Sequence, residues 1–170
     1  PILCFTTEEA YLSRFPEATD SVHLKLAPEI PTEWRNNGLA AKWEQIREVR
    51  RVVTGALEIE RREKRIGSSL EAAPTIHIED KALMTLVQNE DWAEIGITSA
   101  ATLKATKAPK DAFRLEDVPN VAVVPGLAQG QKCARSWRIL PEVGSDKDFP
   151  DLSLRDAEAI REFDKRAGGK

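Results

Sequence analysis

The chain has 170 residues, of which 41% are hydrophobic and 31% are charged. This length can form one large domain or two small ones, and the high charged fraction indicates a water-soluble protein with a buried core. No apolar run approaches the ~18 residues of a membrane span, so no membrane partner is predicted.

The N-terminal sequence and the cysteines bear on the compartment of the protein. The opening residues "PILCFTTEEAYL" lack the basic start of a signal peptide and are interrupted by Glu8 and Glu9. Cys4 and Cys133 lie far apart in sequence, so we expect no disulfide framework and a reducing, cytoplasmic location. Because the sequence starts with Pro1 rather than methionine, we expect it to be a segment of a longer protein.

The net charge of −3 conceals blocks of opposite sign along the chain. Residues 66–103 are acidic, whereas residues 42–65 and 104–114 are basic. Residues 126–140 contain three basic side chains and no acidic one. Such blocks indicate either basic patches on an acidic protein or ordinary charge balance between solvated faces.

The first part of the chain is predicted to be helical. A helix is expected from Thr6, which can cap the backbone with the help of Glu9, and it should end before Pro16. A proline-rich connector follows to Pro31, with a short alternating piece at Val22–Leu26.

The longest predicted element is a helix from about Asn37 to Ile66. Its apolar side chains recur with a period of 3.6 residues and predict one buried stripe, made of Leu39, Trp43, Ile46, Val49, Val53 and Leu57. Gly55 is a weak position in this helix, and Gly67 suits a left-handed cap after it.

Four arginines lie on a different face of this helix: Arg47, Arg51, Arg62 and Arg65. They indicate either a solvated face with ion pairs such as Glu58 with Arg62, or a helix that presents guanidinium groups to phosphates. Composition alone favours the solvated face.

The rest of the chain has the pattern of a small mixed module. Strands are predicted at Thr75–Ile78, within residues 92–100, and twice within residues 120–140 around a glycine-rich turn; a short helix is predicted at residues 80–88. His77 stands alone in the first strand, which indicates a surface or half-buried side chain rather than a ligand. A last helix should follow Ser153 as its N-cap, with an inner face made of Leu154, Ala157, Ile160 and Phe163.

We therefore predict an α+β fold. A helical N-terminal part with one long helix, residues 1–66, is followed by a small mixed α/β module, residues 67–170.

No motif in the sequence predicts a catalytic residue. The sequence has neither common type of glycine-rich phosphate loop and no G-x-S-x-G element. No motif places a histidine or an acidic residue to activate Cys133 as a nucleophile.

The stretch "GQKCARSWRIL" resembles half of a zinc-binding pattern. Cys133 stands three residues before Ser136, whose hydroxyl is a poor zinc ligand, and neither cysteine nor histidine follows it. Structural zinc takes about four ligands, usually from two such pairs. We therefore predict that no metal binds and that Cys133 is all that remains of the pattern.

Several stretches resemble the C-terminal part of class I aminoacyl-tRNA synthetases, and of the isoleucyl-tRNA synthetases in particular. They are "PILCFTTEEAYL", which is similar to a segment of that family's anticodon-binding helical domain, the helix sequence "WEQIREVRRVVTGALEIERREKRIGSSLEA", and "KCARSW", which is similar to the first half of the family's zinc motif. The resemblance spans residues 1 to about 140. It implies that residues 1–66 end the anticodon-binding domain and that residues 67–170 contain a degenerate zinc-finger-like segment.

The resemblance also implies what the whole enzyme does. Such an enzyme joins isoleucine to its tRNA with ATP, but neither of the family's ATP-binding signatures, HIGH and KMSKS, is present here: "HIED" at His77 lacks the glycine. We therefore expect the catalytic core to lie outside this chain, which needs no cofactor of its own. Valyl- and leucyl-tRNA synthetases share the helical architecture and are alternatives.

The expected partner is tRNA, contacted near its anticodon. Single-stranded bases are bound by stacking platforms and phosphate contacts, and the candidates for these roles are Arg47, Arg51, Arg62, Arg65, Lys132, Arg135, Trp137 and Arg138. The alternative is a structural scaffold that packs against the catalytic body or a second chain and touches RNA weakly, with Trp137 as a core residue beneath a basic turn.

Overall fold

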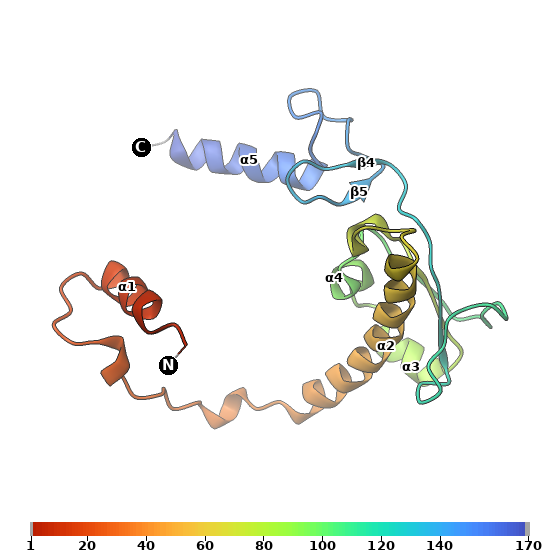
Figure 1. The fold of residues 1–170 in the computed structure, drawn as a ribbon, viewed down its shortest axis with the longest axis horizontal. Coiled ribbons are helices and arrows are strands. Elements are labelled where there is room, and N and C mark those ends of the chain that lie inside the picture. Colours follow the sequence, from red (N-terminus) through yellow and green to blue (C-terminus); the bar gives the residue numbers. More distant parts are fainter. Residues whose placement is uncertain (1, 169–170) are drawn as a thin grey trace. The chain divides into compact units, whose positions relative to one another are not determined.

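The computed structural model describes residues 2–168 (Figure 1). It comprises two compact units, of which the first ends at Asn37 and the second begins at Gly38. The first unit is helical, and the second combines helices with small sheets, so the predicted α+β class is confirmed. Within the described residues, none of the helices has both the length and the apolar character that a bilayer-spanning segment requires.

The first unit contains one α-helix and two short 3₁₀ helices: α1 (Cys4–Arg14), η1 (Val22–Leu24) and η2 (Thr32–Trp34). The predicted cap at Thr6 is wrong, because α1 begins after Leu3 and no side chain caps it. Glu8 stabilises the loop after α1, because its carboxylate accepts hydrogen bonds from Ser21 Oγ at 2.8 Å and from the Val22 amide at 3.0 Å. The alternating piece after Ser21 forms the turn η1 rather than a strand.

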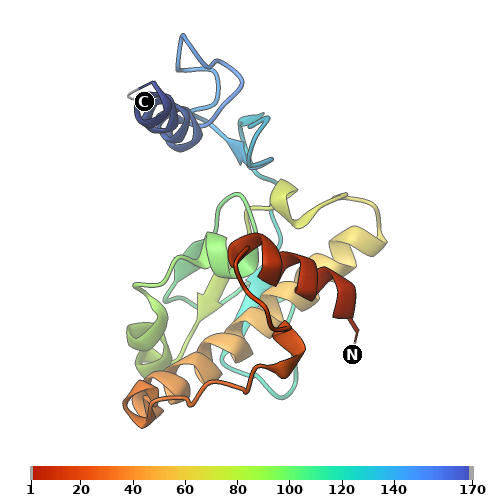
Figure 2. The same ribbon diagram turned by 90° about the vertical axis from the view of Figure 1, so that its left-hand side faces the viewer.

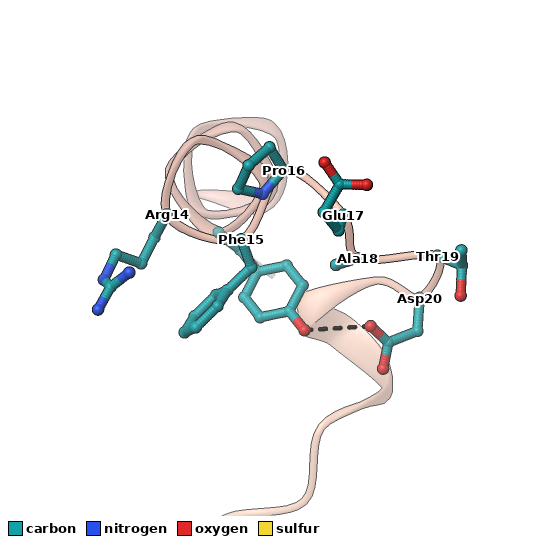
Figure 3. A pocket seen from close by; sticks show the side chains of 8 residues that line it. Arg14, Phe15, Pro16, Glu17, Ala18, Thr19 and Asp20 are labelled. Carbon is teal, nitrogen blue, oxygen red and sulfur yellow. Dashed lines mark hydrogen bonds between the residues drawn. The ribbon is translucent and has the colours of Figure 1, made fainter.

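A hollow of about 580 Å³ lies within the first unit, lined by residue 11 and residues 14–20 (Figure 3). Two of its lining residues are joined, because the Tyr11 hydroxyl donates to Asp20 Oδ1 at 3.1 Å. Asp20 also pairs with Lys25 Nζ at 2.5 Å. These polar groups satisfy one another, and the hollow is lined by none of the predicted site residues.

The long helix is confirmed as α2, Asn37–Arg62. Its buried face consists of Ile46, Val49, Val52, Val53, Ala56 and Leu57. Leu39 and Trp43 belong to the predicted stripe but are 50% and 39% exposed. The hydrophobic core that α2 forms with the rest of the second unit includes α2 side chains only from Ile46 onward.

Helix α2 ends earlier than expected, and Gly67 does not terminate it. The left-handed residue is Lys64, with φ of 58°. The Lys64 amide donates to the Arg61 carbonyl, and the Arg65 amide donates to the Glu60 carbonyl. This pair of hydrogen bonds is the Schellman arrangement, which normally places glycine where Lys64 stands.

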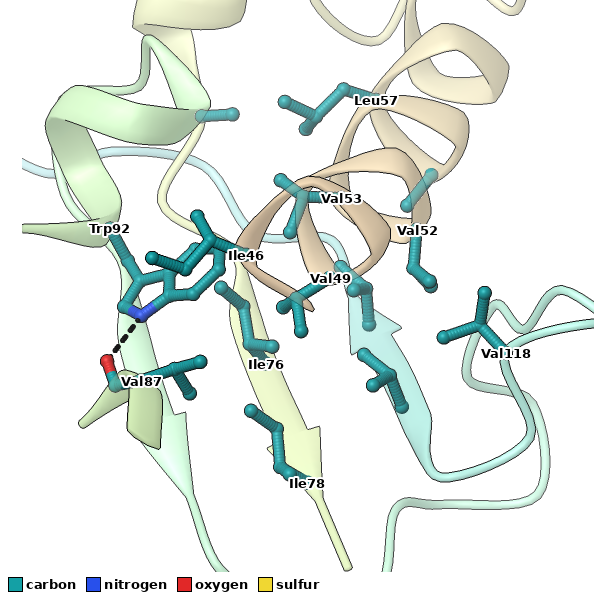
Figure 4. Close-up of a cluster of buried hydrophobic side chains, with 14 of the residues drawn as sticks. Ile46, Val49, Val52, Val53, Leu57, Ile76, Ile78, Val87, Trp92 and Val118 are labelled. Atoms are coloured by element: carbon teal, nitrogen blue, oxygen red, sulfur yellow. Dashed lines mark hydrogen bonds between the residues drawn. The ribbon is translucent and has the colours of Figure 1, made fainter. Parts of the chain in front are cut away.

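A three-stranded sheet packs against α2 (Figure 2). Its central strand is β1 (Thr75–Ile78), as predicted, with β2 (Thr102–Lys104) parallel on one side and β3 (Val121–Val124) antiparallel on the other. Side chains of β1 and β3 interlock with the buried face of α2 (Figure 4). His77 on β1 is buried, and its Nδ1 lies 3.1 Å from the Thr106 carbonyl oxygen.

Two short helices complete this core: α3 (Lys81–Val87), as predicted, and α4 (Trp92–Gly96). The strand expected within residues 92–100 is wrong, because Asp91 caps α4 by accepting from the Glu94 amide at 3.0 Å. The helix then stops at Ile97, whose φ is 54°. Trp92 is buried, and its indole donates to the Val87 carbonyl at 2.9 Å (Figure 4).

The C-terminal part consists of a short hairpin and a helix: β4 (Gln131–Lys132), β5 (Ile139–Leu140) and α5 (Leu154–Ala167). Ser153 is the predicted N-cap of α5, and its Oγ accepts from the Asp156 amide at 3.2 Å. The predicted inner face is only half correct, because Leu154 and Phe163 are 50% and 70% exposed. A second small core joins the hairpin to α5, made of Cys133, Val143, Leu152 and Ala157.

The division of the chain differs from the expected boundary between residues 66 and 67. The two compact units meet after Asn37. The reason is that α2 and the sheet share one core, in which Ile46 and Val49 lie with Ile76 and Val123. A helix that buries its apolar face on a sheet belongs to the same unit as that sheet.

Candidate RNA-binding surface

The hairpin turn presents Trp137 to solvent. The Cys133 amide donates to the Arg138 carbonyl at 2.8 Å, and the Trp137 amide donates to the Cys133 carbonyl at 2.9 Å. These bonds close a tight turn in which Trp137 takes a left-handed φ of 62°. The Trp137 side chain is 62% exposed, so the alternative of a core tryptophan does not hold.

Two basic side chains belong to the same turn as this ring. Lys132 Nζ lies 5.4 Å from the centre of the Trp137 ring, within the range of a cation–π contact. Arg135 is exposed on the same turn. The turn therefore combines an accessible aromatic face with two cations, and no acidic residue occurs from 126 to 140.

Arg138 belongs to the same turn but serves a structural purpose. One terminal nitrogen of its guanidinium donates to the Ser99 carbonyl at 2.7 Å, and its Nε is buried without a partner in the described part of the chain. The Ser99 hydroxyl in turn accepts from the Ile139 amide at 2.6 Å and donates to the Leu70 carbonyl at 2.5 Å. Arg138 thus ties the hairpin to the α2 core, and its guanidinium is only partly accessible.

The four arginines predicted on and just after α2 differ in whether carboxylates engage them. Arg51 pairs with Glu48 at 2.7 Å and with Asp117 at 2.6 Å, and Arg65 pairs with Glu60 at 2.6 Å. Arg47 and Arg62 are exposed, and no ion pair involves either of them within residues 2–168. The ion pair expected between Glu58 and Arg62 is instead formed with Arg61.

Beneath the turn, four polar side chains meet between the hairpin and α5. Cys133 Sγ donates to Asp156 Oδ2 at 3.2 Å and accepts from the Ser153 amide at 3.3 Å. Ser153 Oγ donates to Asp156 Oδ2 at 2.9 Å. Ser136 Oγ is buried here without a well-aligned hydrogen bond in the described structure. We call Cys133, Ser136, Ser153 and Asp156 the polar cluster.

Asp156 is the charged centre of the polar cluster. It is 4% exposed, and burial alone would raise its pKa. The nearby side chains of Ser136, Cys133 and Ser153, together with Arg155, outweigh burial and hold the pKa of Asp156 well below its usual range. The carboxylate is therefore ionised at neutral pH and accepts the hydrogen bonds that join the hairpin to α5.

The polar cluster does not fit structural zinc. It offers one thiol, one carboxylate and two hydroxyls, whereas such sites usually take four sulfur or nitrogen ligands. In the described part of the chain, no three side chains of His, Cys, Asp or Glu come together as a metal site requires. The contribution of Asp156 was missed from the sequence, although Ser153 and Asp156 have the spacing of a capping box.

The chain matches curated relatives over nearly its whole length. It is 62% identical over 163 residues to the isoleucine–tRNA ligase of Agrobacterium fabrum, which covers 96% of this chain and 17% of the relative. The identity is 56% over 163 residues for the Bartonella henselae isoleucine–tRNA ligase, and 52% over 168 residues for that of Caulobacter vibrioides. No family model matches the chain.

This chain is similar to one segment of the isoleucine–tRNA ligases. It spans about 17% of the length of the isoleucine–tRNA ligases just named. The resemblance to the isoleucyl-tRNA synthetases is therefore confirmed, and so is the expectation of a segment of a longer protein.

Proposed function

We propose that the chain is the tRNA-binding segment of an isoleucine–tRNA ligase and contacts the anticodon end of the tRNA. The whole enzyme would act in the cytoplasm and join isoleucine to its tRNA with ATP, using a catalytic core outside this chain. The similarity to three named isoleucine–tRNA ligases at 52% to 62% identity supports the assignment to this enzyme.

The exposed Trp137 ring is the observation that carries the RNA-binding role. An exposed tryptophan loses apolar contacts that a core position would give it, yet the turn holds this ring outward at a left-handed φ. Bases of single-stranded RNA stack on such rings, and neighbouring cations bind their phosphates. Lys132 and Arg135, on the same turn, would make these phosphate contacts.

The remaining candidates contribute unequally. Arg47 and Arg62 are exposed on α2 and are suited to phosphate contacts outside the hairpin. Arg51 and Arg65 are engaged by carboxylates, so binding a phosphate would require them to exchange partners. Arg138 is engaged by the Ser99 carbonyl and positions the hairpin.

The experiment compares Trp137→Ala and Arg135→Ala with the unchanged 170-residue chain, using a transcript of isoleucine tRNA and a salt titration. Trp137→Ala should weaken binding by a factor of roughly 5 to 150, because loss of one base stack costs ~1–3 kcal/mol. Arg135→Ala should also weaken binding and reduce the salt slope by about one if Arg135 contacts a phosphate. Both variants should melt like the unchanged chain, since both side chains are exposed.

Matched controls separate the turn from the surface in general. Trp34→Ala removes a tryptophan that is 74% exposed in the first unit, and Lys147→Ala removes an exposed cation outside the turn. Both controls should bind the transcript like the unchanged chain. Equal losses in the controls would refute a specific role for Trp137 and Arg135.

A second candidate function is a structural scaffold that packs against another part of the ligase. It is favoured by large apolar side chains of the first unit that are 74% to 92% exposed: Ile2, Phe5, Leu24, Leu26, Ile30 and Trp34. Salt-dependent binding of the transcript supports the first candidate. Failure of the folded chain to bind it at any salt concentration would support the scaffold.

A further inference from the structure

A groove runs between the hairpin turn and helix α5. It has a volume of about 450 Å³ and is lined by Arg135, Ala159, Ile160, Glu162, Phe163 and Arg166. Phe163 is 70% exposed, although its position in the sequence suggested an inward side chain. The groove is therefore lined by apolar side chains, one of them an accessible aromatic ring, together with two guanidinium groups and one carboxylate.

The charges of the groove favour a singly charged anion. Arg135 has no ion pair within the described residues, and Arg166 lies 3.3 Å from Glu162, with both of these side chains largely exposed. Exposed pairs of this kind are weak, about 0–1 kcal/mol, so Arg166 can exchange Glu162 for another anion. Two guanidinium groups against one carboxylate leave one positive charge in excess.

The groove is continuous with the surface around Trp137, because Arg135 belongs to both. A ligand that stacks on Trp137 and has a repeating anionic backbone would reach the groove through Arg135. Single-stranded RNA has this chemistry: each nucleotide offers one aromatic face and one phosphate charge. Arginine also binds phosphates in a two-pronged geometry.

We propose that this groove is a second RNA subsite, which holds one nucleotide next to the nucleotide stacked on Trp137. Phe163 stacks on the base, and Arg135 and Arg166 bind its phosphate. The inference rests on the proposed function, since it extends the same tRNA-binding surface onto α5.

The test uses the 170-residue chain with two probes, the isoleucine tRNA transcript and its isolated anticodon stem-loop. Phe163→Ala should weaken binding of both probes by about tenfold, with an unchanged melting temperature because the ring is exposed. Arg166→Gln should lower the salt slope by at most about 0.7, the value for one phosphate of a single strand, because Arg135 still contacts the same phosphate. Glu162→Gln should strengthen binding, because it removes the carboxylate that competes with the phosphate for Arg166.

Matched controls lie on the same helix outside the groove. Leu154→Ala removes an apolar side chain that is 50% exposed, and Lys165→Gln removes an exposed cation adjacent to Arg166. Neither control should change affinity or salt slope. The gain expected for Glu162→Gln is a further safeguard, because loss of folding cannot produce tighter binding.

The possible outcomes distinguish failure of the subsite proposal from failure of the proposed RNA-binding function. If Trp137→Ala weakens binding while the Phe163, Arg166 and Glu162 variants behave like the unchanged chain, the groove is not a subsite and the proposed function stands. If the folded chain binds neither probe, both proposals are overturned. Effects of the three groove variants in the expected directions, without effects in the controls, establish the subsite.

Discussion

Replacing Asp156 with alanine should loosen the attachment of the hairpin to α5. Asp156 is 4% exposed and accepts hydrogen bonds from Cys133 Sγ at 3.2 Å, from Ser153 Oγ at 2.9 Å and from Arg155 at 3.1 Å. The variant removes the acceptor that the Cys133 thiol and the Ser153 hydroxyl share, so both buried groups keep only the bonds in which they accept from backbone amides.

The structure sets the size of the effect. A buried polar group left without a partner costs about 1–3 kcal/mol. The Cys133 thiol is a weak donor, and the pair with Arg155, whose side chain is 72% exposed, contributes little. We therefore expect Asp156→Ala to lower the free energy of unfolding by about 3 kcal/mol. Asp156→Asn keeps one acceptor oxygen and nearly the same volume, so its loss should be smaller.

Urea denaturation followed by tryptophan fluorescence measures these changes. Acid adds a second test, because the pKa of Asp156 is lowered in the folded state. The stabilisation from this carboxylate is fully present above its unfolded pKa of ~3.9 and is lost as the pH falls through the lower folded pKa. In Asp156→Asn, this acid-dependent part of the stability should be missing.

An Asp156→Ala variant that unfolds at the same urea concentration as the unchanged chain would contradict this role of Asp156. So would an Asp156→Asn variant that retains the full acid dependence, since the titrating group would then be elsewhere. Glu158→Ala is the matched control, because this exposed carboxylate lies on the same helix and should change neither property.

Three further predictions concern metal, catalysis and the end of α2. Metal analysis of the purified chain should find no zinc, because the polar cluster has one thiol; one zinc per chain, with unfolding on chelation, contradicts this. The chain should show no ATP–pyrophosphate exchange with any amino acid, since both ATP-binding signatures are absent; exchange that survives repurification contradicts this. Lys64→Gly should raise the free energy of unfolding by ~1 kcal/mol, because glycine adopts the left-handed φ of 58° without strain, whereas Lys64→Ala should not.

The sequence predicted elements whose signals are local. The period of α2, the strand at Thr75–Ile78 and the cap at Ser153 each depend on a short pattern that the structure confirms. Residues 92–100 are compatible in length with either a strand or a helix. A helix forms here because the Asp91 side chain caps its N-terminus. The 3.6-residue repeat of apolar side chains also shows which face of α2 is apolar, but not how much of the helix other elements cover. The exposure of Leu39 could therefore not be predicted from the repeat.

Features of the candidate site depend on contacts between distant residues. Arg51 pairs with Asp117, which lies 66 positions away in the sequence, and no local sequence pattern predicts this pair. Cys133 and Asp156 are 23 positions apart and converge only because the hairpin folds onto α5. Composition did indicate the basic, acid-free turn around Trp137, and the structure adds that its ring faces solvent.

Ser99 is a small residue that joins the β4–β5 hairpin to the rest of the second unit. It is 1% exposed and holds the Leu70 carbonyl, the Ile139 amide and, through its own carbonyl, Arg138. If Trp137 stacks on a base as proposed, its ring on a short hairpin needs a fixed reference point in the rest of the protein. Ser99 supplies that reference, because its hydrogen bonds fix the position of the hairpin relative to the helices and sheet around α2. Under the proposed function, RNA would therefore find the Trp137 ring at a fixed distance from that core.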